Sequence, residues 1–273
     1  MKKFEGMLIC TDLDGTLLRN DKSISKENIE AIEYFMREGG YFTYVTGRMP
    51  FYYPDVSLII KNNAPYGCIN GGGLYDNEKK EYIWTQLMSD GIIEMVEYVD
   101  KTFPDVGIIV NTLNIAYFCK ENPVLPFFRE LTHQPDVKRD YNDINEPIAK
   151  VIFTTDIEEE IEELERALRA HPKADEFSFV RSEKKLFEIL PKGIGKGVVI
   201  EKLCEHLGLD INKTVAIGDY NNDISMFRAA KLGVAVSNAC KEALAAADHI
   251  TVSNEEHAIA RIIYDLDEGK IKL

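Results

Sequence analysis

The stretch "CTDLDGTLL", residues 10–18, places two carboxylates two positions apart, directly after a short apolar run. The run Met7–Thr11 has the length and composition of a fully buried strand. Two like charges at the end of a buried strand repel each other and lose hydration, so they need a compensating group nearby. This strand end is therefore the first candidate for a functional site.

The residues after this stretch alternate between helical and strand patterns. Ser25 and the apolar spacing behind it predict a capped amphipathic helix that ends near Gly40. The expected strands of this half are 7–11, 41–45 and 66–69, each followed by small or polar residues. Strand, helix, strand in this order is typical of a doubly wound parallel sheet, which makes the fold class α/β.

The C-terminal part repeats this alternation, whereas the middle of the chain differs from it. Expected elements of the C-terminal part are a helix at 196–207, strands at 214–217, 233–236 and 249–252, and helices near 224 and at 241–247. The middle reads as two helices and several hairpin-like strands, with prolines between them. We expect a core made of residues 1–82 and 191–273, with an α+β module inserted at 83–190.

Acidic and hydroxyl side chains follow the expected core strands, at the edge where open α/β sheets bind ligands. They are Asp12, Asp14, Thr46, Asp219 and Asp223. Carboxylates that converge on one edge repel each other unless a hard cation lies among them. Oxygen ligands without a nearby His or Cys cluster favour Mg²⁺ over Zn²⁺, so Mg²⁺ is the expected cofactor.

The acidic pair suits phosphoryl transfer. Asp12 is the predicted nucleophile, because an attacking carboxylate forms an acyl phosphate. Asp14 is the predicted acid and base, which protonates the leaving oxygen and then takes a proton from water. Gly15 allows close approach of the backbone, and Thr16 is expected either to hold Asp14 or to cap the next turn.

The transferred phosphoryl group is anionic and requires hydrogen-bond donors. The Thr46 hydroxyl, the Gly47 N–H and the Lys196 ammonium are the candidates. Lys196 begins a helix after the turn "PKGIGKG" (191–197), where the helix dipole also attracts an anion. Asn70 follows an expected strand on the same edge, and a turn residue before glycines is its favoured interpretation.

Each of these fragments is weak evidence when taken alone. "DLDGT" (12–16) can be an ordinary turn, "GDYNND" (218–223) a capped turn or part of a Ca²⁺ loop, and Lys196 a solvated surface residue. Together they are much stronger, because each follows or begins the right element and they occur in a workable order.

The combined pattern resembles the haloacid dehalogenase superfamily of phosphatases, in particular its Cof-type subclass IIB. The resemblance rests on "DLDGT", "TGR" (46–48), Lys196 within "GIGKG" and "GDYNND". It implies a Rossmann-like core with an α/β cap inserted between the second and third motifs. It also implies the roles of the site residues. The residues expected at the metal are Asp12, Asp14 (through its backbone carbonyl), Asp219 and Asp223, and those expected to face the substrate are Thr46, Gly47, Lys196 and Asn222.

Two positions stay open within this resemblance. Arg48 is expected either to reach substrate or to pair with an acid of the core, with equal weight. His257 stands where members of the family often have glycine, remote from the predicted chemistry. The carboxylate at Asp14 favours a phosphatase or a phosphomutase over the superfamily's ATPases, which carry threonine there, and over its dehalogenases, which lack the aspartate.

Composition limits the class of partner. The chain has 273 residues, with Lys+Arg 32 and Asp+Glu 46 and a formal net charge of −14, so we expect neither nucleic acid nor membrane as partner. The five cysteines are scattered and include no CxxC pair, which favours reduced thiols and a cytoplasmic protein. The N-terminal residues do not read as a signal peptide, and no run is long enough to span a bilayer.

The sequence thus predicts a Mg²⁺-dependent phosphomonoester hydrolase that acts on small phosphorylated metabolites, sugar phosphates by resemblance. Two alternatives remain: a phosphomutase, which would share the Asp12 and Asp14 pair, and a non-catalytic metabolite-binding protein, which would be expected to have lost a motif residue.

Overall fold

The computed structural model describes residues 2–52, 62–132 and 134–273. These residues form two compact units. The first comprises the described residues of 1–47, 54–84 and 195–273, and the second those of 48–53 and 85–194. The domain borders predicted after residues 82 and 190 stay a prediction, because compactness alone does not test independent folding.

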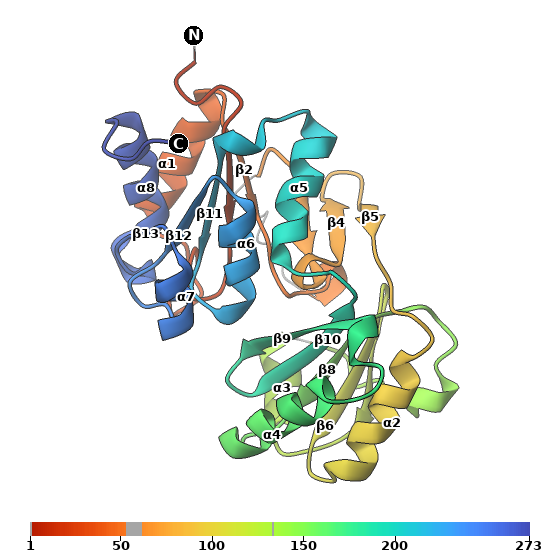
Figure 1. Ribbon diagram of the computed structural model, residues 1–273. Coiled ribbons are helices and arrows are strands. Elements are labelled where there is room, and N and C mark those ends of the chain that lie inside the picture. The colour runs from red at the N-terminus through yellow and green to blue at the C-terminus, as the bar shows by residue number, and fades with distance from the viewer. Residues whose placement is uncertain (1, 53–61, 133) are drawn as a thin grey trace. The chain divides into compact units, whose positions relative to one another are not determined.

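A parallel five-stranded sheet forms the centre of the first unit (Figure 1). In spatial order its strands are β13 (His249–Ile250), β12 (Leu232–Ala235), β11 (Thr214–Gly218), β1 (Leu8–Thr11) and β2 (Tyr41–Tyr44). β1 lies between β11 and β2, with Leu8 opposite both Thr214 and Tyr41. All four residues of β1 are buried, as expected for a strand covered on both faces.

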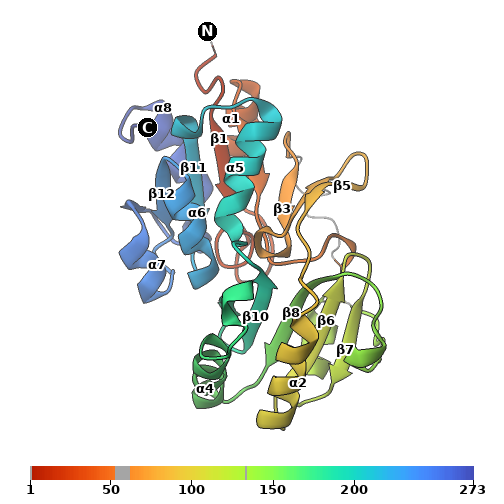
Figure 2. The ribbon, with the colours of Figure 1, turned by 45° about the vertical axis from the view of Figure 1, so that its right-hand side comes forward.

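Helices cover both faces of this sheet, as Figures 1 and 2 show. They are α1 (Lys26–Arg37) and α8 (Ala258–Asp267) on one face, and α5 (Lys196–Leu207), α6 (Ile224–Ala229) and α7 (Lys241–Ala246) on the other. Ser25 caps α1, and its hydroxyl accepts the N–H of Asn28 at 3.2 Å. Leu8 and Cys10 pack in one buried cluster with Val199 of α5. The α/β fold class and the doubly wound parallel sheet are therefore confirmed.

The third expected strand does not join this sheet. β3 (Tyr66–Cys68) pairs antiparallel with β4 (Gly73–Asp76), and β5 (Glu81–Thr85) completes a separate three-stranded sheet. A single parallel bridge between Val45 and Gly67 connects β3 to the end of β2. β3 thus runs parallel to the end of β2, as predicted, but its ladder is with β4 and not with the five-stranded sheet, and the sequence did not predict this small antiparallel sheet.

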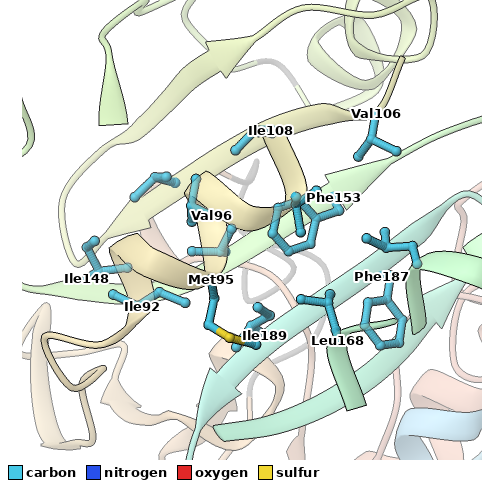
Figure 3. Packing of buried hydrophobic residues seen from close by; sticks show 14 of the residues in the cluster. Ile92, Met95, Val96, Val106, Ile108, Ile148, Phe153, Leu168, Phe187 and Ile189 are labelled. Carbon is cyan, nitrogen blue, oxygen red and sulfur yellow. The ribbon is translucent and has the colours of Figure 1, made fainter. Parts of the chain in front are cut away.

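The second unit is an antiparallel sheet with helices. In spatial order its strands are β7 (Ala116–Lys120), β6 (Gly107–Thr112), β8 (Ile148–Thr154), β10 (Leu186–Pro191) and β9 (Phe177–Glu183). Its helices are α2 (Ile92–Thr102), α3 (Leu125–Thr132) and α4 (Glu158–Arg169). Figure 3 shows Met95 and Val96 of α2 and Leu168 of α4 against Phe153 and Phe187 of the sheet. This mixed architecture agrees with the expected α+β module.

Among the described residues, two α-helices were not predicted. α3 begins two residues after Pro123, and Pro126 is its second residue. Proline is tolerated in the first turn of a helix, where its missing N–H has no intrahelical partner. α8 follows His257, whose φ of 63° lies in the left-handed region. Glycine adopts such a conformation without strain, which explains why glycine suits this position.

Candidate active site

Asp12 is the first residue after β1, at the carboxyl end of the parallel sheet. Its N–H donates to the carbonyl of Ile217 at 2.8 Å, which extends the strand pairing with β11 by one residue. The residue is 7% exposed. Burial raises the pKa of the Asp12 carboxyl well above its ordinary value, Lys196 opposes this rise, and nearby carboxylates add to it.

The Lys196 side chain is fully buried and lies between two carboxylates. Its Nζ is 2.6 Å from Asp12 Oδ1 and 2.5 Å from Asp223 Oδ1. Burial by itself would lower the pKa of Lys196, but the two carboxylates outweigh burial and raise it above its ordinary value. Lys196 is therefore a charged ammonium in contact with the predicted nucleophile, and not a solvated surface lysine.

Asp219 follows β11, and its carboxylate lies against the turn after Asp12. Its Oδ1 accepts the hydroxyl of Thr16 at 2.7 Å. A Cβ atom on Gly15 would lie 2.7 Å from Asp219 Oδ2, and Gly15 has a φ of +78°, so the turn requires glycine for both reasons. The expectation that Thr16 holds Asp14 or caps a turn was wrong, since its hydroxyl holds Asp219.

Asp14 has a different environment from Asp12. Its Oδ1 is 2.9 Å from Lys22 Nζ, and its side chain is 36% exposed. Lys22 is not among the site residues that the sequence pattern predicts. The lysine lies eight residues after Asp14 in the same loop, so its proximity to the acidic pair was the available signal. The partly exposed Asp14 can exchange protons with solvent more readily than the buried Asp12.

Asp12, Asp219 and Asp223 form a group that could hold a metal ion, with one oxygen of each within 4.8 Å of the others. Burial and the neighbouring Asp223 raise the pKa of Asp219 from 3.8 to about 7, although its bond from Thr16 opposes this. Counting Asp14, four carboxylates face the two ammonium groups of Lys196 and Lys22. The excess negative charge and the all-oxygen donor set fit a divalent hard cation.

The Thr46-Gly47 turn lies beside a second polar group. The carbonyl of Thr46 accepts the N–H of Asn70 at 3.1 Å, and the N–H of Thr46 donates to the carbonyl of Gly67 at 2.9 Å. The side chain of Asn70 accepts a hydrogen bond from Asn222 Nδ2 at 3.1 Å. Asn222, a predicted substrate contact, is thus linked through Asn70 to the turn after β2.

The structure brings together most of the predicted site residues. Asp12, Lys196, Asp223 and Asp219 form one cluster, and Asn222 joins Thr46 and Gly47 through Asn70. Arg48 belongs to the second compact unit, and both of its interpretations stay predictions. The catalytic and binding roles of all these residues also stay predictions. No helix among the described residues is long and apolar enough to cross a membrane.

Comparison with known proteins identifies the family. The model of the haloacid dehalogenase-like hydrolases matches residues 9–263. The chain is 29% identical over 288 residues to the 5-amino-6-(5-phospho-D-ribitylamino)uracil phosphatase YwtE of Bacillus subtilis, covering 96% of this chain and 98% of that protein. It is 28% identical to the chloroplastic endoribonuclease YBEY of Arabidopsis thaliana over 94% of this chain, but spans only 46% of that protein.

Among solved structures, the chain is similar to the subclass IIB sugar phosphatase BT4131. The TM-score is 0.84 with 23% identity, over 97% of this chain and all of that one, so this likeness concerns the fold. The family model covers most of the sequence, including all four motifs that carry the resemblance. The chain therefore belongs to the haloacid dehalogenase-like hydrolases, and its fold is that of the family's subclass IIB members.

Proposed function

We propose that this protein is a Mg²⁺-dependent phosphomonoester hydrolase that works through an aspartyl-phosphate on Asp12. The observation that carries the proposal is the buried Asp12 carboxylate, held 2.6 Å from the buried Lys196 ammonium among other acids. A desolvated carboxylate fixed in one orientation is a more effective nucleophile than a hydrated one. Family membership and a relative named as a phosphatase support the same reaction class.

The reaction would run in two displacements. Asp12 attacks phosphorus, the bond to the leaving oxygen breaks, and Asp14 gives that oxygen a proton. Asp14 then takes a proton from water, which attacks phosphorus and releases inorganic phosphate with Asp12 restored. Lys22, 2.9 Å from Asp14, would hold the Asp14 carboxylate in place for both proton transfers. Lys196 would offset the negative charge that gathers around Asp12.

The acidic cluster would hold the metal. Both oxygens of Asp223 already have partners: Oδ1 accepts from Lys196, and Oδ2 accepts the N–H groups of Asp219 and Tyr220 at 2.9 and 3.0 Å. We therefore propose Asp12 and Asp219 as the direct carboxylate ligands, with the Asp14 carbonyl, and Asp223 as the residue that holds Lys196 and the loop. Bound Mg²⁺ would neutralise the carboxylates and the phosphoryl oxygens.

The substrate class is the finer part of the proposal. YwtE is named for a substrate with a phosphorylated ribityl chain, which supports a small phosphorylated metabolite, such as a sugar phosphate, for this chain too. We propose that Thr46, Gly47 and Asn222 contact the substrate, and that the inserted module at 83–190 is the cap that selects the leaving group.

We place the activity in the cytoplasm, since the cysteines among the described residues are free thiols.

The test is phosphate release from a panel of sugar phosphates and other small phosphomonoesters. We expect release with Mg²⁺ and none after EDTA. A search for isomerised monophosphates in the same reactions separates a phosphatase from a phosphomutase. Absence of release from every compound, with Mg²⁺ present, would contradict the proposed reaction class.

A further inference from the structure

Three consecutive residues between β3 and β4 have left-handed backbone conformations. They are Ile69, Asn70 and Gly71, with φ values of 58°, 50° and 101°. The left-handed region is common for glycine and tolerated by asparagine, but for β-branched isoleucine it costs about 1–2 kcal/mol. All three residues are buried. Strain of this kind persists only where the surrounding structure holds it, and it concentrates at functional sites.

Asn70 is placed by this strained turn against the turn after β2. Its N–H donates to the carbonyl of Thr46 at 3.1 Å. Its side chain lies directly on Gly47, since a Cβ atom on that glycine would be 2.9 Å from both Asn70 Nδ2 and Oδ1. Gly47 is a residue that we propose to hold the phosphoryl group. Asn70 thus packs against Gly47 through its side chain and binds the neighbouring Thr46 through its backbone, and both contacts limit the movement of the Gly47 backbone.

Gly71, at the end of the same turn, contacts the start of α5. A Cβ atom on Gly71 would lie 2.1 Å from the carbonyl oxygen of Gly195 and 2.9 Å from the backbone nitrogen of Lys196. Only glycine fits this approach. The strained turn therefore contacts both the Thr46-Gly47 turn and the residue that carries the buried ammonium.

Asn70 also contacts the loop after β11, through its amide. Asn222 Nδ2 donates to Asn70 Oδ1 at 3.1 Å, while Asn70 Nδ2 and Asn222 Oδ1 are buried and have no partner among the described residues. The oxygen and nitrogen of an amide can be assigned in two ways. If they are exchanged in both Asn70 and Asn222, one hydrogen bond still joins the two side chains, and one donor and one acceptor still have no partner among the described residues. Buried polar atoms normally have partners, and each one left unsatisfied costs about 1–3 kcal/mol. Two such atoms at one place indicate a site completed by a polar ligand.

We infer that Asn70 is a positioning residue of the phosphate site. It holds the Gly47 backbone and the Asn222 amide in the arrangement that receives a phosphorylated ligand, and the strained turn keeps Asn70 there. This inference rests on the proposed function, because it takes Gly47 and Asn222 as groups that face the substrate.

The test compares two variants that each remove a buried asparagine amide. Asn70→Gly keeps the left-handed backbone without strain, so its melting temperature should stay within a few degrees of wild type. We expect its kcat/KM to fall about 10- to 100-fold and its Kd for inorganic phosphate, titrated calorimetrically with Mg²⁺, to rise about 10-fold. Partial unfolding would lower the rate without changing that Kd.

Asn28→Ala is the matched control. Asn28 is fully buried in α1, its Oδ1 accepts the N–H of Ala260 at 2.9 Å, and its Nδ2 has no partner among the residues described. Asn28→Ala should lose stability while its Kd for phosphate and its kcat/KM stay within about twofold. Asn222→Ala, alone and combined with Asn70→Gly, should give less than additive losses, because the two amides act through one contact.

The outcomes separate the inference from the proposed function. Wild-type phosphate affinity in Asn70→Gly overturns the inference, whether or not the protein releases phosphate from monoesters. A second outcome is that the wild type hydrolyses no monoester but binds phosphate more tightly than Asn70→Gly does. This result overturns the proposed hydrolase and keeps the inference. A wild type that neither binds phosphate nor releases it overturns both.

Discussion

Each of the two units buries a lysine against a carboxylate, but the two lysines have different surroundings. In the second unit Lys150 of β8 is 2.8 Å from Glu188 of β10, and Ser182 donates to the other oxygen of Glu188 at 2.5 Å. In the first unit Lys196 contacts both Asp12 and Asp223. All the side chains of these three ion pairs are at most 11% exposed.

The difference lies in the balance of charge. Lys150 and Glu188 compensate each other, and both carboxylate oxygens of Glu188 accept hydrogen bonds. Around Lys196 the carboxylates outnumber the ammonium groups, and the pKa values of Asp12 and Asp219 are raised, mainly by burial. A balanced buried pair is explained by folding alone, whereas an unbalanced one remains unfavourable until a cation binds. A buried lysine is therefore informative about function only together with its charge environment.

Replacing each lysine by methionine should give the largest contrast. Lys196→Met should lower kcat roughly a thousandfold, because the charge around Asp12 is no longer offset. Lys150→Met should leave kcat per folded molecule near wild type and lower the free energy of unfolding by about 3–5 kcal/mol, because Glu188 stays buried without its partner. Steady-state phosphate release and urea unfolding measure the two effects.

The double variant Lys150→Met/Glu188→Leu sharpens this comparison. Replacing both charges of a balanced pair by apolar groups is often neutral, so most of the stability lost in Lys150→Met should return. A double variant that is as unstable as the single one, or that has lost phosphatase activity, would show that the Lys150–Glu188 pair has a role beyond a balanced structural ion pair of the sheet.

Adding Mg²⁺ should stabilise the unbalanced cluster. At one hundred times its Kd, the ion should raise the free energy of unfolding by about 2.7 kcal/mol, since it binds the folded state. Asp219→Asn should lose most of this stabilisation, and the matched Glu188→Gln should keep it. Thermal unfolding with and without Mg²⁺ measures the shift, and an equal shift in both variants would place the ion elsewhere.

The smallest expected effect concerns the balanced pair. Ser182→Ala removes the donor to Glu188 Oε1 and should lower the free energy of unfolding by about 1 kcal/mol. Its kcat and KM should stay at wild-type values. A changed KM would mean that the Glu188 pair takes part in substrate recognition, which would break the contrast between the two lysines.

The predictable part of the site followed from the direction of parallel strands. Asp12 and Asp219 each come after a strand, and the carboxyl ends of neighbouring parallel strands meet at one edge, so their proximity could be expected. Lys196 could be placed by its position at the start of a helix. The joint order of these fragments also indicated the family, which the match over residues 9–263 shows.

The rest depended on contacts between side chains distant in sequence. Thr16 binds Asp219 across 203 positions of the chain, and no local pattern specifies that partner. The strained conformation of Ile69 contradicts the preferences of a β-branched residue, so propensity argues against the turn that the fold imposes. The helix α8, by contrast, could have been predicted from the sequence, because Ile259, Ile262 and Ile263 show helical spacing.

The central claim is that Asp12 carries the phosphoryl group between the two displacements. The most direct measurement is rapid acid quenching during turnover of a ³²P-labelled phosphomonoester, followed by peptide mapping of the denatured protein. We expect the label on the peptide that contains Asp12, and base should release it. The label should be absent from Asp12→Asn, although this variant should keep its fold and, without phosphate, its stability. Phosphate release at wild-type rates from Asp12→Asn, or label on another residue, would contradict it.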